Sequence, residues 1–139
     1  MGKTVAMAVL AFAVSGPAVV FGDDPPALRK GMWEYKRTLV GQGAGGKDAQ
    51  IANKQCVDPG LSMKAMGEAL AKQGCKVTPA STKGNVRTSI WECPMQGTMV
   101  RSESVLTVTS DSAYTVNITT SGGGKTNKEV LVAKRIGDC

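Results

Sequence analysis

The chain shows two spacings of apolar residues. In "GMWEYKRTLV", which covers residues 31–40, Trp33, Tyr35 and Leu39 fall on one side and polar residues on the other. An alternation with a period of two is typical of a strand with one buried face. It predicts a first strand here and, after the loop "GQGAGGK", a weaker second strand over residues 48–57.

The period lengthens to that of a helix in "DPGLSMKAMGEALAKQGC", which begins at Asp58. Ser62 is expected to cap its start, and Gly74 is expected to end its last turn. Three apolar residues share one face of this helix: Met63, Met66 and Leu70. Such a face most often packs against a core, although methionines also form adaptable binding surfaces.

The period of two returns after the helix. Five further strands are predicted, in the order "CKVTPAST", "VRTSIWEC", "GTMVRSESVLTVT", "AYTVNITT" and "KEVLVAKRI". The first two flank Gly84, which can supply the positive φ of a hairpin turn. The sequence therefore predicts an α+β fold that is mostly β, with about seven antiparallel strands in a curved sheet or partly closed barrel and one amphipathic helix.

Residues 1–22 have the features of a secretory signal peptide. Lys3 precedes an uncharged apolar run over residues 4–14, and small residues near Gly22 suit cleavage at that point. A membrane-spanning helix needs about 20 consecutive apolar residues, which this run does not reach. We expect a signal peptide at 1–22, an extended lead-in at 23–30 and a single β-rich domain at 31–139, located in the periplasm or secreted.

The charge of the chain is moderately positive. Residues 1–22 contain only Lys3 among the charged residues, so their removal would lower the net charge from +6 to +5. The basic residues are scattered, and the aromatic residues are only two Trp, two Tyr and two Phe. Nucleic-acid binders usually combine a basic stripe with stacking aromatics, so we expect no nucleic acid as partner and keep anionic envelope components as candidates.

Four cysteines are expected to form two disulfide bonds, because an exported chain with an even number of cysteines usually pairs them. A hairpin centred on Gly84 places Cys75 opposite Cys93. If the helix returns along the sheet, Cys56 and Cys139 meet at the other end, where a bond would hold the end of the chain. We favour these two pairs over the rival that joins Cys56 to Cys75 across the helix.

Several kinds of chemistry are disfavoured by composition. The chain has no histidine and no Cys-x-x-Cys pair, and its acidic residues are scattered. Zinc sites, thiolate catalysis and serine nucleophiles usually depend on the missing groups. We therefore expect no catalytic residue, no metal and no cofactor.

Several fragments occur in an order that resembles a known family. They are "GMWEYKRT", "QCVDPG", "GCKV", "IWEC", "SDSAYTVNITT" and "RIGDC". Together they are similar to the domain-of-unknown-function family number 3617, small exported proteins found mainly in Proteobacteria. Met32 stands where members typically have Leu, and Val57 and Asp58 follow Cys56 where members typically have Leu and Thr. The resemblance implies export, a β-rich fold and the four-cysteine framework.

The leading hypothesis is an exported, non-enzymatic protein that binds an apolar or amphiphilic ligand, or a protein partner. Its candidate surface comprises the three helix residues, Met63, Met66 and Leu70, and the two tryptophans, Trp33 and Trp91, which are otherwise expected in the core. The alternative is a binder of anionic envelope polymers or lipid head groups, acting through its positive charge. An enzyme that uses carboxylates or a lysine is the third hypothesis.

Overall fold

A computed structural model describes residues 26–139 of the chain, and the predicted signal peptide lies outside these residues. Within them are seven strands: β1 (Gly31–Leu39), β2 (Ala49–Val57), β3 (Lys76–Lys83), β4 (Val86–Met95), β5 (Thr98–Ser110), β6 (Ala113–Gly122) and β7 (Lys125–Gly137). A helix, α1 (Pro59–Lys72), connects β2 to β3, and a short 3-10 turn, η1 (Ala44–Gly46), lies in the β1–β2 loop. The predicted number and order of the elements are confirmed.

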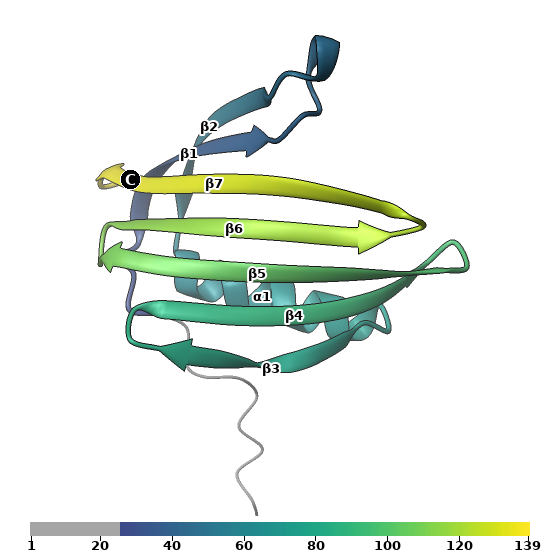
Figure 1. Cartoon of the computed structure of the whole chain (residues 1–139). Helices are drawn as coiled ribbons and strands as arrows, with labels where there is room; N and C mark the ends of the chain where they lie inside the picture. The colour runs from purple at the N-terminus through teal and green to yellow at the C-terminus, as the bar shows by residue number, and fades with distance from the viewer. Residues whose placement is uncertain (1–25) are drawn as a thin grey trace, which may run out of the picture.

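All seven strands form one antiparallel sheet in the order β2-β1-β7-β6-β5-β4-β3. Strands β3 to β7 follow one another as a meander, and β1 then pairs with β7 (Figure 1). The sheet does not close, because β2 and β3 remain as its two edges. The curved sheet is thus the form adopted, rather than a closed barrel.

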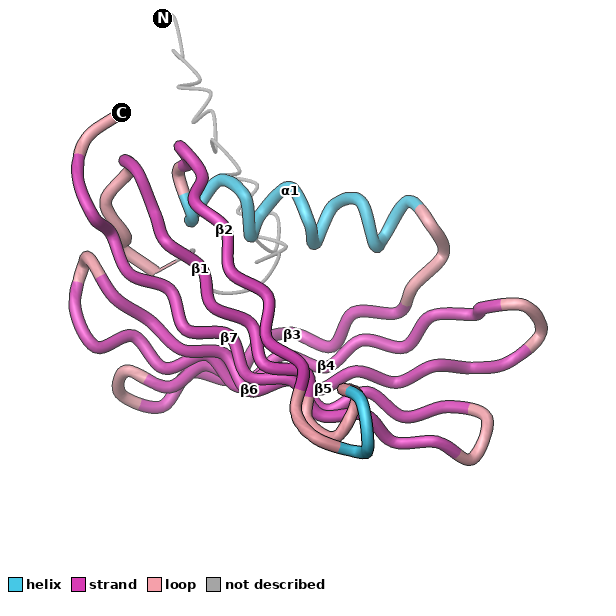
Figure 2. Tube along the Cα trace, turned by 90° about the horizontal axis from the view of Figure 1, so that it is seen from above, coloured by secondary structure: helices cyan, strands magenta, loops and turns pink. Residues whose placement is uncertain are grey.

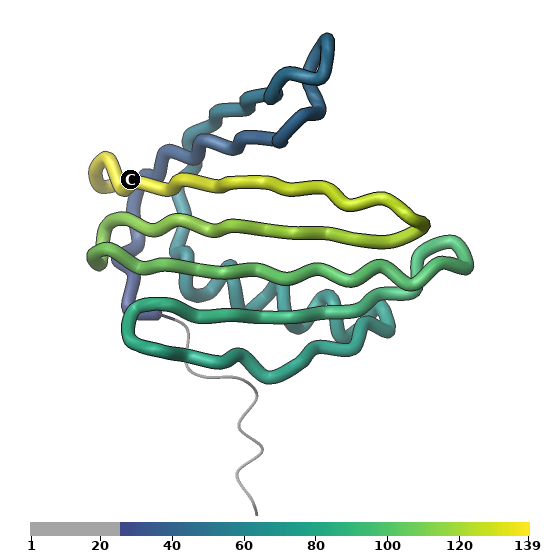
Figure 3. Tube along the Cα trace, in the orientation of Figure 1, coloured from purple at the N-terminus to yellow at the C-terminus, as the bar shows by residue number. Residues whose placement is uncertain are grey.

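The curvature gives the sheet a concave face, and α1 lies over it (Figure 2). The helix runs along the strand direction, so the chain leaves β2 at one end of the sheet and enters β3 at the other (Figure 3). In Figure 1, α1 passes behind β4 and β5, and its Met63 packs against the buried residues of the sheet. The helix therefore covers one side of the concave face and leaves the rest to other segments.

The helix begins one turn earlier than Ser62. Asp58 is the N-cap, and its carboxylate accepts a hydrogen bond from the backbone N–H of Leu61 at 3.2 Å. Pro59 follows at the first helical position, where its missing N–H costs nothing. The expected cap at Ser62 is wrong because Asp58 and Pro59 form the stronger start signal. Gly74 follows the helix with a φ of +84°, as expected for a C-terminal glycine.

The core is small and lies between the concave face and the segments that cover it. Its buried cluster consists of Trp33, Leu106, Tyr114 and Ala133, and the partly buried Leu28 and Met63 pack against this cluster. The Trp33 indole N–H donates a hydrogen bond of 2.9 Å to the carbonyl of Arg29, which fixes the lead-in across one end of the sheet. The prediction that Trp33 is a core residue is confirmed, since it is 0% exposed.

Candidate functional site

The register of the sheet divides its concave face into an apolar part and a hydroxyl-rich part. Paired residues on neighbouring antiparallel strands point to the same face, so each pairing can be followed across the sheet. Two rows are mainly apolar: Tyr35, Ala133, Tyr114 and Val108, and then Arg37, Leu131, Val116, Leu106 and Arg87, a row with an arginine at each end. The next two are mainly polar: Glu129, Ile118, Ser104 and Ser89, and then Asn127, Thr120, Ser102 and Trp91.

Arg87 ends the second apolar row and is followed on the same face of β4 by Ser89. It is half-buried, and it contributes a guanidinium to a surface that is otherwise apolar on one side. Ser89 is paired with Ser104 of β5, so two hydroxyl groups lie one row beyond the cation. The boundary between the apolar part and the hydroxyl-rich part of the concave face therefore has a cation and hydroxyl groups on one side and aliphatic side chains on the other.

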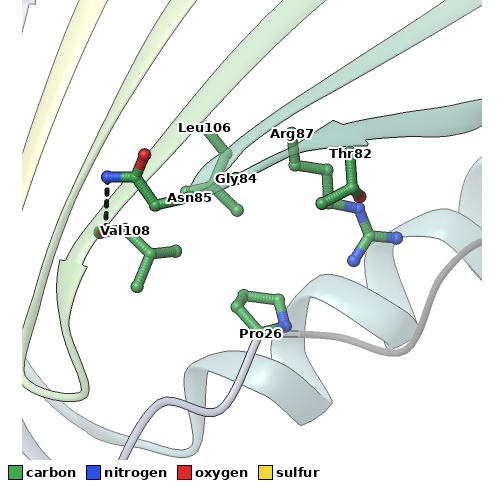
Figure 4. A pocket seen from close by; sticks show the side chains of 7 residues that line it. All are labelled: Pro26, Thr82, Gly84, Asn85, Arg87, Leu106 and Val108. Carbon is green, nitrogen blue, oxygen red and sulfur yellow. Dashed lines mark hydrogen bonds between the residues drawn. The ribbon is translucent and has the colours of Figure 1, made fainter.

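A cavity of about 480 Å³ opens at the apolar part of this face. Figure 4 shows Leu106 and Val108 on one side and Pro26 of the lead-in opposite them, with α1 behind. The remaining lining residues come from the β3–β4 hairpin: Thr82, Gly84, Asn85 and Arg87. Its volume lies within the range of small-ligand sites, and three of its seven lining residues, Thr82, Asn85 and Arg87, have polar side chains.

The rim of the cavity is held by the turn of that hairpin. The side-chain amide of Asn85 donates a hydrogen bond of 3.0 Å to the carbonyl of Val108, and the Val108 N–H donates one of 3.0 Å to the Asn85 carbonyl. Gly84 precedes Asn85 with a φ of +62°, a conformation that glycine adopts without strain. The turn is thereby tied to β5 and holds the rim in place.

Two tyrosines belong to the other apolar row, where Tyr114 lies opposite Val108 and Tyr35 lies opposite Ala133. Burial raises the pKa of Tyr114. The nearby Tyr35 phenol raises this pKa further, through electrostatic repulsion and through a hydrogen bond. Burial also raises the pKa of Tyr35, and the hydrogen bond with Tyr114 opposes this effect in part. The Tyr114 ring also packs on Trp33, with 5.5 Å between ring centroids. Both phenols are therefore kept in their neutral form.

The five residues of the predicted binding surface do not form one surface. Trp33 is in the core and Met63 packs against it, whereas Met66 is 57% exposed and Leu70 is half-buried. Trp91, expected in the core, is only half-buried and does not belong to the buried cluster. That expectation is wrong because the row of Trp91 continues into hydroxyl residues rather than aliphatic ones.

The residues that line the cavity were not singled out from the sequence. Leu106 and Val108 alternate along their strand as core residues do, and Arg87 resembles a solvated strand residue. Only the pairing of β4 with β5 places Arg87 directly opposite Leu106. The sequence signal that could have predicted this pairing is the β4–β5 turn at Gly97, because counting back along both strands from this turn places Arg87 opposite Leu106.

Both disulfide bonds follow the favoured pairing. Cys56 is bonded to Cys139 and Cys75 to Cys93, with Cα–Cα distances of 5.8 and 4.2 Å. They lie at opposite ends of the strands, as the return of the helix along the sheet requires. Among the cysteines of residues 26–139, none is free.

Residues 26–139 contain no group of three or more His, Cys, Asp or Glu side chains placed to hold a metal ion. None of the helical segments in this range has the length and apolar character to cross a membrane.

Comparison with known proteins gives one match, which covers most of the chain. Residues 28–139 match the family model described as Protein of unknown function (DUF3617). The chain belongs to the DUF3617 family. This confirms the resemblance of the ordered fragments, and the matched range contains all seven strands, α1 and the four cysteines. No curated protein and no solved structure matches the chain.

Proposed function

We propose that this DUF3617 protein is an exported binding protein that holds a single amphiphilic molecule with an acidic head group against the concave face of its sheet. The apolar tail occupies the cavity at Leu106 and Val108, and the head group lies beside Arg87. Two disulfide bonds support a location outside the cytoplasm, because such bonds persist in oxidising compartments.

The observation that carries this proposal is the small amount of core that the protein buries by itself. The buried hydrophobic residues of the described chain are Trp33, Cys93, Leu106, Tyr114 and Ala133. A domain of this length can bury a larger core. On the same face, Val116, Leu131 and Val108 are only partly buried, and Val108 lines an open cavity, so a bound tail would complete the packing.

The head group is assigned to Arg87 on grounds of charge. A guanidinium has five N–H donors in a planar fork that suits carboxylate and phosphate groups, and it can contact several acceptors at once. The neighbouring Ser89 and Ser104 add hydroxyl groups on the polar side of the boundary. The net positive charge of the chain favours an anionic ligand in addition.

A binding role is proposed in preference to catalysis. The described residues whose pKa is shifted are Tyr35 and Tyr114, and both shifts favour the neutral phenol. A catalytic base needs a pKa near the working pH, and these shifts move the pKa of both tyrosines further above it. The sequence also has no histidine to act as a general base.

The test is equilibrium titration of the purified protein with two probes that share a twelve-carbon tail: dodecanoate and the neutral dodecanol. We expect both to bind, and dodecanoate to bind more tightly. Arg87→Gln should weaken dodecanoate binding by about tenfold and leave dodecanol binding unchanged, because one charge-assisted interaction is lost.

The matched control is Arg101→Gln. Arg101 is an exposed arginine on the next strand, paired with Glu92 on the convex face. It has the same charge as Arg87 but no contact with the cavity, so its variant should bind both probes as the wild type does. Absence of binding by either probe, or equal losses in the two arginine variants, would contradict the proposed site.

A further inference from the structure

The β4–β5 hairpin extends beyond the strands on either side of it. The pairing of β3 with β4 reaches only to Lys76 and Glu92, and that of β6 with β5 reaches only to Arg101 and Ser121. Residues 94–99 pair with each other across the hairpin and with no other strand of the described chain. Figure 1 shows this tip projecting past the β6–β7 turn. Both of its faces are therefore exposed.

The projecting tip is apolar and uncharged. Met95 and Met99 are each 57% exposed, and Pro94 beside them is exposed as well. The residues between the two methionines are Gln96, Gly97 and Thr98, which carry no charge. Exposed apolar side chains gathered on a projection mark a contact surface, and methionine adapts to irregular or fluid surroundings better than branched residues do.

The segments around the tip are basic. The end of α1 with the start of β3 (69–76), the hairpin itself (93–102) and the β6–β7 turn (119–128) lie at the same end of the sheet. None of these three segments contains Asp or Glu. They contribute five exposed cations: Lys72, Lys76, Arg101, Lys125 and Lys128. Four acids border these segments: Glu68, Glu92, Glu103 and Glu129. Glu92 lies opposite Lys76, Glu103 forms an ion pair of 3.6 Å with Arg101, and Glu129 forms one of 2.7 Å with Arg37.

We propose that this end of the molecule docks on an anionic lipid surface, with Met95 and Met99 entering the boundary between head groups and acyl chains. An apolar tip surrounded by cations fits such a surface, because the methionines gain apolar contact while the lysines remain at the level of the phosphates. A protein partner with an acidic rim would offer the charge but not a fluid apolar layer that accepts a projection from both faces. This docking is independent of whether the cavity at Leu106 holds a ligand.

The test is co-sedimentation of the protein with vesicles, using the double variant M95Q/M99Q. Vesicles of phosphatidylglycerol and phosphatidylcholine at low salt should bind the wild type, and vesicles of phosphatidylcholine alone should bind it several-fold less. The double variant should bind the anionic vesicles about tenfold more weakly, because two half-exposed methionines no longer leave water. Added salt should weaken wild-type binding steeply, as expected for exposed cations.

Leu61→Gln is the control, because Leu61 is 64% exposed but lies at the opposite end of α1. This variant should bind vesicles as the wild type does. A thermal unfolding curve checks that M95Q/M99Q is folded. As a second measurement, Met99→Trp should show quenching by brominated lipid. The proposal would be overturned if the wild type did not bind anionic vesicles or bound neutral vesicles equally well. It would also be overturned by equal losses of binding in M95Q/M99Q and Leu61→Gln, or by an unquenched tryptophan in Met99→Trp.

Discussion

Cys56, near the end of β2, is bonded to Cys139 across a sequence separation of 83 residues. In the sheet, β1 lies between β2 and β7, so the bond reaches past β1 at one end of the sheet. It joins the residues just before α1 to the residues just after β7. The segment that leads into the helix and the edge of the sheet are therefore held by one covalent link.

We expect Cys139→Ser to lower the free energy of unfolding by about 2–5 kcal/mol, the usual range for a native disulfide that closes a long loop. Thiol titration of the unfolded, unreduced variant should find one free thiol, at Cys56. The Cys75–Cys93 bond should remain in non-reducing peptide maps. A peptide joining Cys56 to Cys75 in the wild type would contradict the pairing.

The two tryptophans should differ in their contribution to stability. Trp33→Ala should cost about 3–5 kcal/mol, because it empties the centre of the buried cluster. Trp91→Ala should cost about 1–2 kcal/mol, because the side chain is half-buried in a polar row. Chemical denaturation of the two variants measures the difference, and equal losses would show that Trp91 belongs to the core.

Gly31 and Gly67 form a matched pair for substitution by alanine. Gly31 has a φ of +153°, and a Cβ there would lie 2.5 Å from the carbonyl oxygen of Gly137, so Gly31→Ala should destabilise the protein. Gly67 lies within α1 and its Cβ would meet nothing within 4 Å, so Gly67→Ala should add about 0.5–1 kcal/mol of stability. Thermal unfolding should move in opposite directions for the two variants.

Tyr35 and Tyr114 are the only tyrosines of the chain, so tyrosinate absorbance reports on them alone. Both have a pKa raised above the ordinary value of 10.0, and the shift at Tyr114 is large. The folded protein should therefore form tyrosinate at a higher pH than the protein in denaturant. Because the unfolded state loses these protons first, stability should be unaffected below pH 10.0 and fall as the pH rises above it. Coincident titrations in the two states would contradict the burial of the pair.

Much of the fold could be predicted from the sequence, because each strand carries its own period of two and α1 its own helical period. The Cys75–Cys93 pair could also be predicted, since hairpin symmetry about Gly84 is a local property, whereas the Cys56–Cys139 pair depended on the assumption that the helix returns along the sheet. The extent to which each side chain is buried could not be predicted, because Trp91 shows the same alternation as Trp33 although Trp33 alone belongs to the buried cluster. Whether a residue on the concave face is covered depends on where α1 and the lead-in lie.

The candidate site was missed for the same reason. In the sequence, Arg87 has the pattern of an ordinary solvated strand residue. Only the β4–β5 register shows that it lies opposite Leu106. The methionines of α1 were the more conspicuous candidates in the sequence, but Met63 packs against the core and Met66 lies exposed. A binding surface built from four different strands has no signature within any one of them.

The most direct test of the proposed function is native mass spectrometry of the protein released gently from its own cell envelope. We expect a one-to-one complex whose excess mass is that of an acidic amphiphile, which is lost from the Arg87→Gln variant and retained by Arg101→Gln. A spectrum that shows only the unliganded mass, in a protein that also fails to take up dodecanoate, would contradict it.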